Sequence, residues 1–240
     1  LAFVALGVGG TLRALVAGTP AQDFRAGVEA YGQHAYVAAR DAFARVAAAE
    51  PRAADAWANF GTAAWAARDT AGAVVGWRRA LGLEPLADDA RDRLGLVHGV
   101  PAMAPGYVPP APIDLLLLVM ALAWIAVCAA WHPAVRDRTP AAPRLIVPAV
   151  VVAALFGLAA IALSGRLDGR RLAVVRGPAM LSTDPGFGAG VGSDVETGEI
   201  VRVLSQQGAW MRVEVDGGRQ GWLPAQQLVA LDAPLPSPLD

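Results

Sequence analysis

Apolar residues follow a repeating pattern over the first part of the chain. Between residues 20 and 85 the pattern has a period of about 34 residues, and each repeat carries two apolar stretches with helical spacing. Proline lacks an N–H and ends the second helix of each repeat. The pattern predicts helix pairs at 20–51 and 54–85 and a closing helix at 87–97. The equivalent positions are Gly27 and Gly61, Tyr31 and Trp65, Ala39 and Ala73, Phe43 and Trp77, Val46 and Ala80, and Pro51 and Pro85.

The second repeat resembles the tetratricopeptide repeat. The signature positions of that family hold Trp57, Phe60, Gly61, Ala73, Trp77, Ala80 and Pro85. The first repeat departs from the family at Asp23 and Ala26, where large apolar residues are usual. The resemblance implies an all-α superhelix over residues 21–98, with a groove for a peptide or partner protein. The groove candidates by position are Phe24, Tyr31, Asn59 and Trp65. These side chains could instead pack against the neighbouring repeat.

Two long runs without charged residues follow, at 115–131 and 145–165. Each is close to the roughly 20 residues that a helix needs to cross the hydrocarbon core of a membrane. Arginine outnumbers aspartate in the loop 132–144 between them, which the positive-inside rule places in the cytoplasm. The sequence therefore predicts transmembrane helices at 113–131 and 145–165 in a bacterial inner membrane. Both large flanking domains would then be extracytoplasmic, although the arginines after the second run weaken its charge bias.

The remaining non-helical segments have distinct compositions. Residues 1–20 are apolar apart from Arg13 and suggest a signal peptide or, alternatively, an N-terminal membrane anchor. Residues 99–112 contain five prolines and predict a semi-rigid linker. The proline-containing end of the chain, 234–240, is expected to be a disordered tail.

The pattern changes to short β-type runs within residues 166–233. The predicted strands are 172–175, 179–182, 200–204, 210–215 and 221–223. Glycine-containing turns separate several of these runs, and Asp216-Gly217 is a strong hairpin signal. Five short strands in so short a segment predict a small all-β barrel.

This segment resembles the bacterial SH3-like domain. The resemblance rests on Gly198, the run 200–204, Gly208-Ala-Trp210, Val213, the run 218–223 and Leu228. It departs from the family after Leu181, where Ser-Thr-Asp-Pro-Gly replaces the usual loop. Domains of this class often bind cell-wall peptides or proteins. Trp210 and Trp222 could line such a ligand surface, or they could belong to the core.

Composition excludes several kinds of chemistry. All 20 basic residues are arginine, so no lysine is available as a nucleophile or phosphate ligand. The single cysteine, Cys128, lies in an apolar run, and the three histidines lack the spacing of metal ligands. A phosphate-binding glycine loop leads into a helix, but no helix is predicted after the glycine-rich run 186–192. We therefore expect no catalytic site, metal or cofactor, and the net charge of −1 indicates no nucleic-acid partner.

The order of these parts predicts a multidomain membrane protein with helical repeats, a two-helix transmembrane hairpin and a barrel. That order resembles the BatE-like proteins of the Bacteroides-aerotolerance group. The resemblance implies a non-catalytic envelope scaffold whose repeats bind a partner outside the lipid membrane. It also implies partners, which are Bat proteins with a von Willebrand A domain and a MoxR-type ATPase. The alternative is a protein that binds or senses peptidoglycan through the SH3-like domain.

Overall fold

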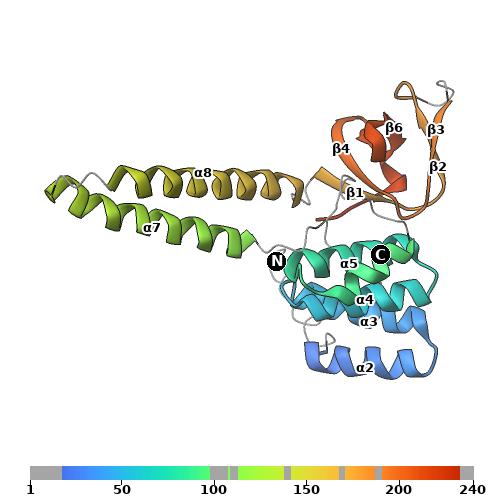
Figure 1. Cartoon of the computed structure of the whole chain (residues 1–240). Helices are drawn as coiled ribbons and strands as arrows, with labels where there is room; N and C mark the ends of the chain where they lie inside the picture. The colour runs from blue at the N-terminus through green and yellow to red at the C-terminus, as the bar shows by residue number, and fades with distance from the viewer. Residues whose placement is uncertain are drawn as a thin grey trace, which may run out of the picture.

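The first part of the structure is a layer of five helices. The structure is a computed structural model and describes residues 18–97, 108, 113–137, 142–167, 171–186 and 191–232. Consecutive helices pack against each other, and the layer runs from α2 at its free side to α5 beneath the sheet (Figure 1). The helices are α2 (Pro20–Gly32), α3 (Tyr36–Ala49), α4 (Ala54–Ala66), α5 (Thr70–Leu83) and α6 (Asp88–Val97).

Local capping fixes where two of these helices begin. The Thr19 hydroxyl accepts a hydrogen bond from the backbone N–H of Gln22, and the Gln22 side chain accepts one from the Thr19 N–H at 2.9 Å. This reciprocal pair satisfies N–H groups that the first turn of α2 leaves without a helical partner. At the start of α5, the Asp69 carboxylate accepts a bond from the Gly72 N–H at 2.9 Å. Both starts are therefore encoded in side chains next to the helix.

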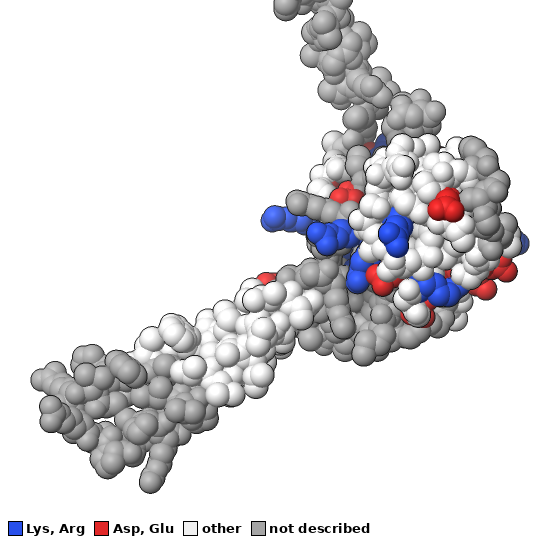
Figure 2. Space-filling view, turned by 90° about the horizontal axis from the view of Figure 1, so that it is seen from above, with Lys and Arg blue, Asp and Glu red and all other residues white. Residues whose placement is uncertain are grey.

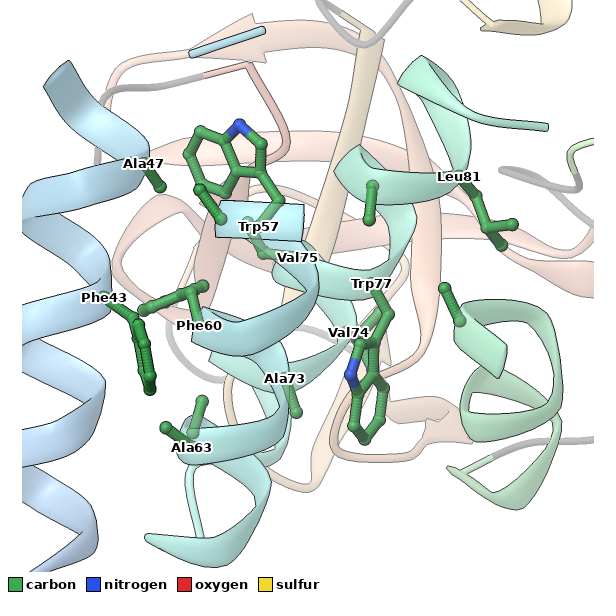
Figure 3. Close-up of a cluster of buried hydrophobic side chains, with 14 of the residues drawn as sticks. Phe43, Ala47, Trp57, Phe60, Ala63, Ala73, Val74, Val75, Trp77 and Leu81 are labelled. Carbon is green, nitrogen blue, oxygen red and sulfur yellow. The ribbon is translucent and has the colours of Figure 1, made fainter. Parts of the chain in front are cut away.

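A glycine–aromatic contact joins the two helices of each pair. A Cβ atom at Gly27 would lie 2.8 Å from the Phe43 ring, and one at Gly61 would lie 2.7 Å from the Trp77 ring. The missing side chain thus leaves room for an aromatic ring from the next helix. Figure 3 shows both rings among the buried side chains. The 34-residue spacing seen in the sequence therefore has a packing cause, because each repeat places a glycine opposite a ring.

Helix α5 is buried on opposite sides. One side lies so close to α4 that a Cβ atom at Gly76 would come within 2.6 Å of the Gly61 backbone. The other side contacts strand β1 of the sheet (Leu172–Val175). A helix that is apolar on most of its surface is typical of such a central position. Its buried residues are Ala71, Ala73, Val74, Val75, Gly76, Trp77, Arg78, Ala80 and Leu81.

The helical layer and the sheet share one hydrophobic core. Leu172, Val174 and Leu231 of the sheet region belong to the same buried cluster as the α3–α6 side chains. The layer is therefore one face of a mixed α and β core. This sharing contradicts the predicted all-α tetratricopeptide domain, because one side of α5 is completed by strands rather than by a further helix.

The second part of the described chain is an antiparallel sheet of seven strands. The order across the sheet is β3-β2-β6-β5-β4-β1-β7. Its strands are β1, β2 (Ala179–Ser182), β3 (Val191–Val195), β4 (Ile200–Gln207), β5 (Trp210–Glu214), β6 (Gln220–Pro224) and β7 (Leu228–Ala230).

This sheet is not a closed barrel, so the predicted SH3-like barrel is wrong. A barrel has no edge strand, because its first and last strands pair. Here β3 and β7 stand at the two ends of the strand order, and each described pairing involves a neighbour in that order. The sheet curls over its own core instead (Figure 1). Val175, Leu181 and Val195 meet there although they come from three different strands.

The turn between β5 and β6 uses glycine for its backbone conformation. Gly217 and Gly218 both have φ at +75°, a left-handed conformation that side chains disfavour. The turn brings the Val215 N–H to the Arg219 carbonyl at 2.9 Å. The hairpin that Asp216-Gly217 predicts is therefore present, with a short 3-10 turn at 216–218.

Two long helices pack against each other and extend from the rest of the molecule (Figure 1). They are α7 (Ile113–Asp137) and α8 (Ala142–Leu167). Within the described residues, no helix is long and apolar enough to span a membrane. The finding contradicts the predicted transmembrane hairpin and the inner-membrane location.

Several predicted segments lie largely outside the described residues. These include residues 1–17 of the apolar start and all of the tail 234–240. Of the predicted linker 99–112, only Val108 is described. Its side chain is 3% exposed, and its carbonyl accepts a hydrogen bond from Arg91 on α6 at 2.5 Å. Val108 is therefore part of the shared core.

Candidate protein-binding surface

The predicted groove residues on α2 are partly packed and partly exposed. The Phe24 ring meets Phe43 edge-on at 5.7 Å between centroids, and the Tyr31 ring meets Tyr36 at 5.3 Å. Phe24 is nevertheless 36% exposed and Tyr31 38% exposed. Val28 lies between them on the same helix face and is also exposed. This face of α2 thus carries an apolar stripe that is partly exposed, and its two rings contact aromatic rings of α3.

The predicted groove residues on α4 lie in a different setting. Asn59 is half-buried, and Trp65 is 45% exposed. The Trp65 ring packs on Trp77 of α5 at 5.9 Å between centroids. No described contact joins Asn59 or Trp65 to Phe24 or Tyr31. The described contacts therefore do not bring the four candidates together in one site.

Next to Trp65, the structure places a polar cluster around Thr62. The Thr62 hydroxyl accepts hydrogen bonds from Arg93 Nη1 at 3.0 Å and from Trp77 Nε1 at 3.4 Å, and it donates to the Ala58 carbonyl at 2.8 Å. One hydroxyl on α4 therefore ties together α5 and α6. We call Thr62, Trp65, Trp77 and Arg93 the Thr62 cluster.

The arginine of the Thr62 cluster is held from two sides. Its Nε donates to both carboxylate oxygens of Asp89, one turn earlier on α6, at 3.0 Å. Its Nη1 donates to Thr62, as above. Its side chain is still 36% exposed. Because the guanidinium is oriented in advance, a ligand would lose less conformational entropy by ordering it.

Sequence reasoning singled out Trp65 but not Thr62 or Arg93. A signal for Thr62 was present, because it stands three residues after Asn59 and three before Trp65 and so shares their helix face. Arg93 gave no such signal. It lies on another helix, and its place beside Thr62 depends on how α6 packs against α5.

The two tryptophans of the predicted barrel surface share one face of the sheet. Trp210 lies opposite Pro224, and Arg212 lies opposite Trp222, in the β5–β6 pairing. Alternation along the strands puts these residues on the face opposite Val213 and Leu223, which are in the core. Both tryptophans are half-buried. The structure therefore brings Trp210 and Trp222 together around Arg212, outside the inner core.

Charges of both signs are interspersed over the sheet and its junction with the helices (Figure 2). Arg202 pairs with Glu214 at 3.4 Å, and Arg219 pairs with Glu199 at 3.7 Å. Such a mixed surface does not create a strong field of one sign. Among the described residues, no group of three or more His, Cys, Asp and Glu side chains could hold a metal ion.

No family model matches the chain, and no curated protein or solved structure matches it either. The resemblances drawn from sequence motifs consequently receive no support from these comparisons. The function has to be argued from the surfaces themselves.

Proposed function

We propose that this protein is a non-catalytic interaction component that binds a segment of a partner protein at the Thr62 cluster. The observation that carries the proposal is that the half-exposed Trp65 ring packs on Trp77, which donates to the same Thr62 hydroxyl as the oriented Arg93 guanidinium. Tryptophan and arginine are the residues most enriched at the centres of protein interfaces. Both side chains are held in place here. Trp65 packs on Trp77, and Arg93 donates hydrogen bonds to Thr62 and Asp89.

The chemistry of the cluster defines what a partner segment should offer. The Trp65 ring provides an apolar surface, and Arg93 provides N–H donors. A complementary segment therefore has an apolar side chain next to a carbonyl or carboxylate acceptor. The partners to test first are those implied by the resemblance to BatE-like proteins, namely a von Willebrand A-domain Bat protein and a MoxR-type ATPase.

The test is a titration of the full chain with each purified candidate partner by isothermal calorimetry. Trp65→Ala is expected to weaken binding by about 30-fold, the loss typical of an interface hot spot. Met180→Ala serves as the control, because Met180 is an exposed apolar residue of strand β2, away from the helical layer. Equal binding by Trp65→Ala and the wild type would refute the assignment of this surface.

The shared face of Trp210, Arg212 and Trp222 favours a second candidate function, the binding of peptidoglycan. Aromatic rings that flank an arginine can contact both the sugar rings and the carboxylates of a wall fragment. The assay is retention of the full chain on purified peptidoglycan. Trp222→Ala should lose retention, whereas Trp65→Ala should keep it. The opposite pattern would assign wall binding to the helical layer instead.

A further inference from the structure

A cavity of about 300 Å³ lies where α5 meets the end of strand β7. This volume is at the lower end of the range for pockets that hold small molecules. Helices α4 and α5 supply one side of the cavity, and the residues that follow β7 supply another. Apolar surface and two arginines line it together. The lining residues are Pro51, Trp57, Arg78, Arg79, Gly82, Leu83, Leu231 and Asp232.

One of the two arginines is already committed to the fold. The Arg79 guanidinium carbon lies 4.3 Å from the centre of the Trp57 ring, and Arg79 Nε donates to the Leu231 carbonyl. Burial lowers the pKa of Arg79, and the nearby negative charge of Asp232 raises it. Arg79 is therefore held by the Trp57 ring, by the Leu231 carbonyl and by the nearby charge of Asp232.

The neighbour, Arg78, has a different environment. It is 3% exposed, and its Nε and Nη2 atoms have no hydrogen-bond partner among the described residues. Burial lowers the pKa of the Arg78 guanidinium to about 10. A buried charge without a partner is costly, so such groups are normally paired. Nε and Nη2 form the edge of the guanidinium whose two N–H bonds are parallel, and this edge binds a carboxylate through both oxygens.

We propose that this cavity binds a small organic carboxylate with an apolar body, and that Arg78 is the group that binds the carboxylate. Trp57, Leu83 and Leu231 would contact the apolar body. Because Nε and Nη2 are shielded from water, the Arg78 side chain must turn toward the cavity when the ligand enters. The Nη1 end of Arg78 already borders Gly82, which lines the cavity, because a Cβ atom there would lie at an ordinary 3.5 Å from Nη1.

The test uses benzoate as the probe and benzamide as its neutral counterpart of nearly the same shape. Binding to the full chain is measured by isothermal calorimetry at millimolar concentrations, together with the shift of the unfolding temperature. Benzoate is expected to bind and to raise the unfolding temperature. Benzamide is expected to bind about 10- to 100-fold more weakly, as the loss of a charged two-point contact predicts. Equal binding of benzamide would overturn the proposal, because it would show apolar filling of the cavity alone.

Arg78→Met is the matched variant, since methionine is apolar and long enough to fill much of the same space. Its unfolding temperature without ligand should be equal to or higher than that of the wild type, because an unpaired buried charge has been removed. It should lose the response to benzoate. Retained benzoate binding in Arg78→Met would also overturn the proposal. If Arg78→Met does not fold, the comparison of benzoate with benzamide on the wild type still tests whether the cavity prefers a carboxylate.

Inorganic phosphate is a third probe, and it tests the apolar half of the proposal. It offers oxygens to Arg78 but has no surface for Trp57, Leu83 and Leu231 to contact. We expect it to bind more weakly than benzoate. Phosphate binding as tight as that of benzoate would refute the stated ligand class and would point to an anion site without apolar selection.

Discussion

The packing of α4 on α5 can be tested by adding a single methyl group at Gly76. In Gly76→Ala, the new Cβ atom would lie 2.6 Å from both the Cα and the N of Gly61, and 2.8 Å from the Trp57 carbonyl oxygen. Ordinary contacts begin at 3.4 Å, and all three contacted atoms belong to the α4 backbone. A flexible side chain could move aside, but backbone cannot, so the two helices would have to separate.

The expected change in the free energy of unfolding of Gly76→Ala is the sum of two opposing effects. Overpacking of a core costs about 1–3 kcal/mol, and the upper end applies here because backbone atoms are contacted. Alanine in place of glycine inside a helix stabilises the folded state by about 1 kcal/mol. The net loss in the free energy of unfolding is therefore about 2 kcal/mol. For a chain of this size, that loss lowers the unfolding temperature by about 4–8 °C.

Gly95 provides the matched control for this variant. It lies inside α6, and a Cβ atom there would meet nothing within 4 Å. Gly95→Ala should therefore stabilise the protein by about 0.5–1 kcal/mol through helix propensity alone. Thermal unfolding of both variants is followed by circular dichroism. If Gly76→Ala unfolds at or above the wild-type temperature, the close approach of α4 and α5 is refuted.

Three further variants test the junctions between elements. Thr62→Val should lose about 1 kcal/mol in denaturant unfolding, because it removes the hydroxyl that joins three helices; an unchanged midpoint would mean that these bonds add no stability. Arg79→Met should destabilise by about 1–2 kcal/mol and speed hydrogen exchange at the Leu231 amide, since the bond to that residue's carbonyl is lost. Unchanged exchange there would contradict this anchor. In Gly221→Ala, the Cβ atom would lie 2.7 Å from Leu181 Cβ, so a loss of about 1–3 kcal/mol is expected in thermal unfolding. A neutral result would show that strands β2 and β6 are less tightly packed.

Strand prediction succeeded where the sequence has both β-formers and clear turns. The predicted runs 172–175 and 179–182 correspond to β1 and β2, and those at 200–204 and 210–215 correspond to β4 and β5 with shifted ends. Strand β3 was missed because glycine-rich sequence precedes it and polar residues occupy it. It is a strand because it pairs with β2, as in the match of Ala179 with Val195. Pairing with a neighbour can outweigh weak intrinsic β-propensity.

The candidate surfaces were predictable only in part. Position in the repeat made Trp65 a groove candidate or a packing residue, and in the structure its side chain is 45% exposed and also packs on Trp77. The sequence could not show that Phe24 and Tyr31 pack on α3 whereas Trp65 packs on α5, since that depends on how the helices assemble. It also left open whether Trp210 and Trp222 belong to the core. The register of β5 on β6 places them on the opposite face from the core residue Val213.

The sequence by itself determined the local structure of this protein. Periodicity, capping residues and glycine turns are properties of neighbouring residues, so they predicted most of the helices and strands. They also fixed the repeated opposition of a glycine and an aromatic ring. The assembly of these elements was not determined in this way. A periodic apolar face predicts that one side of a helix or strand is buried, but it does not identify the element that packs against that side.

Only the tertiary structure decided that α5 lies between helices and strands and that the sheet stays open. The burial of Arg78 illustrates the physical reason. Arg78 and Arg79 are adjacent and chemically identical, so local pattern gives no ground for treating them differently. Arg78 is buried with two nitrogen atoms that have no partner among the described residues, whereas Arg79 is held by the Trp57 ring of α4 and by the Leu231 carbonyl. The bond to Leu231 joins residues 152 positions apart in the chain, which no local sequence pattern predicts.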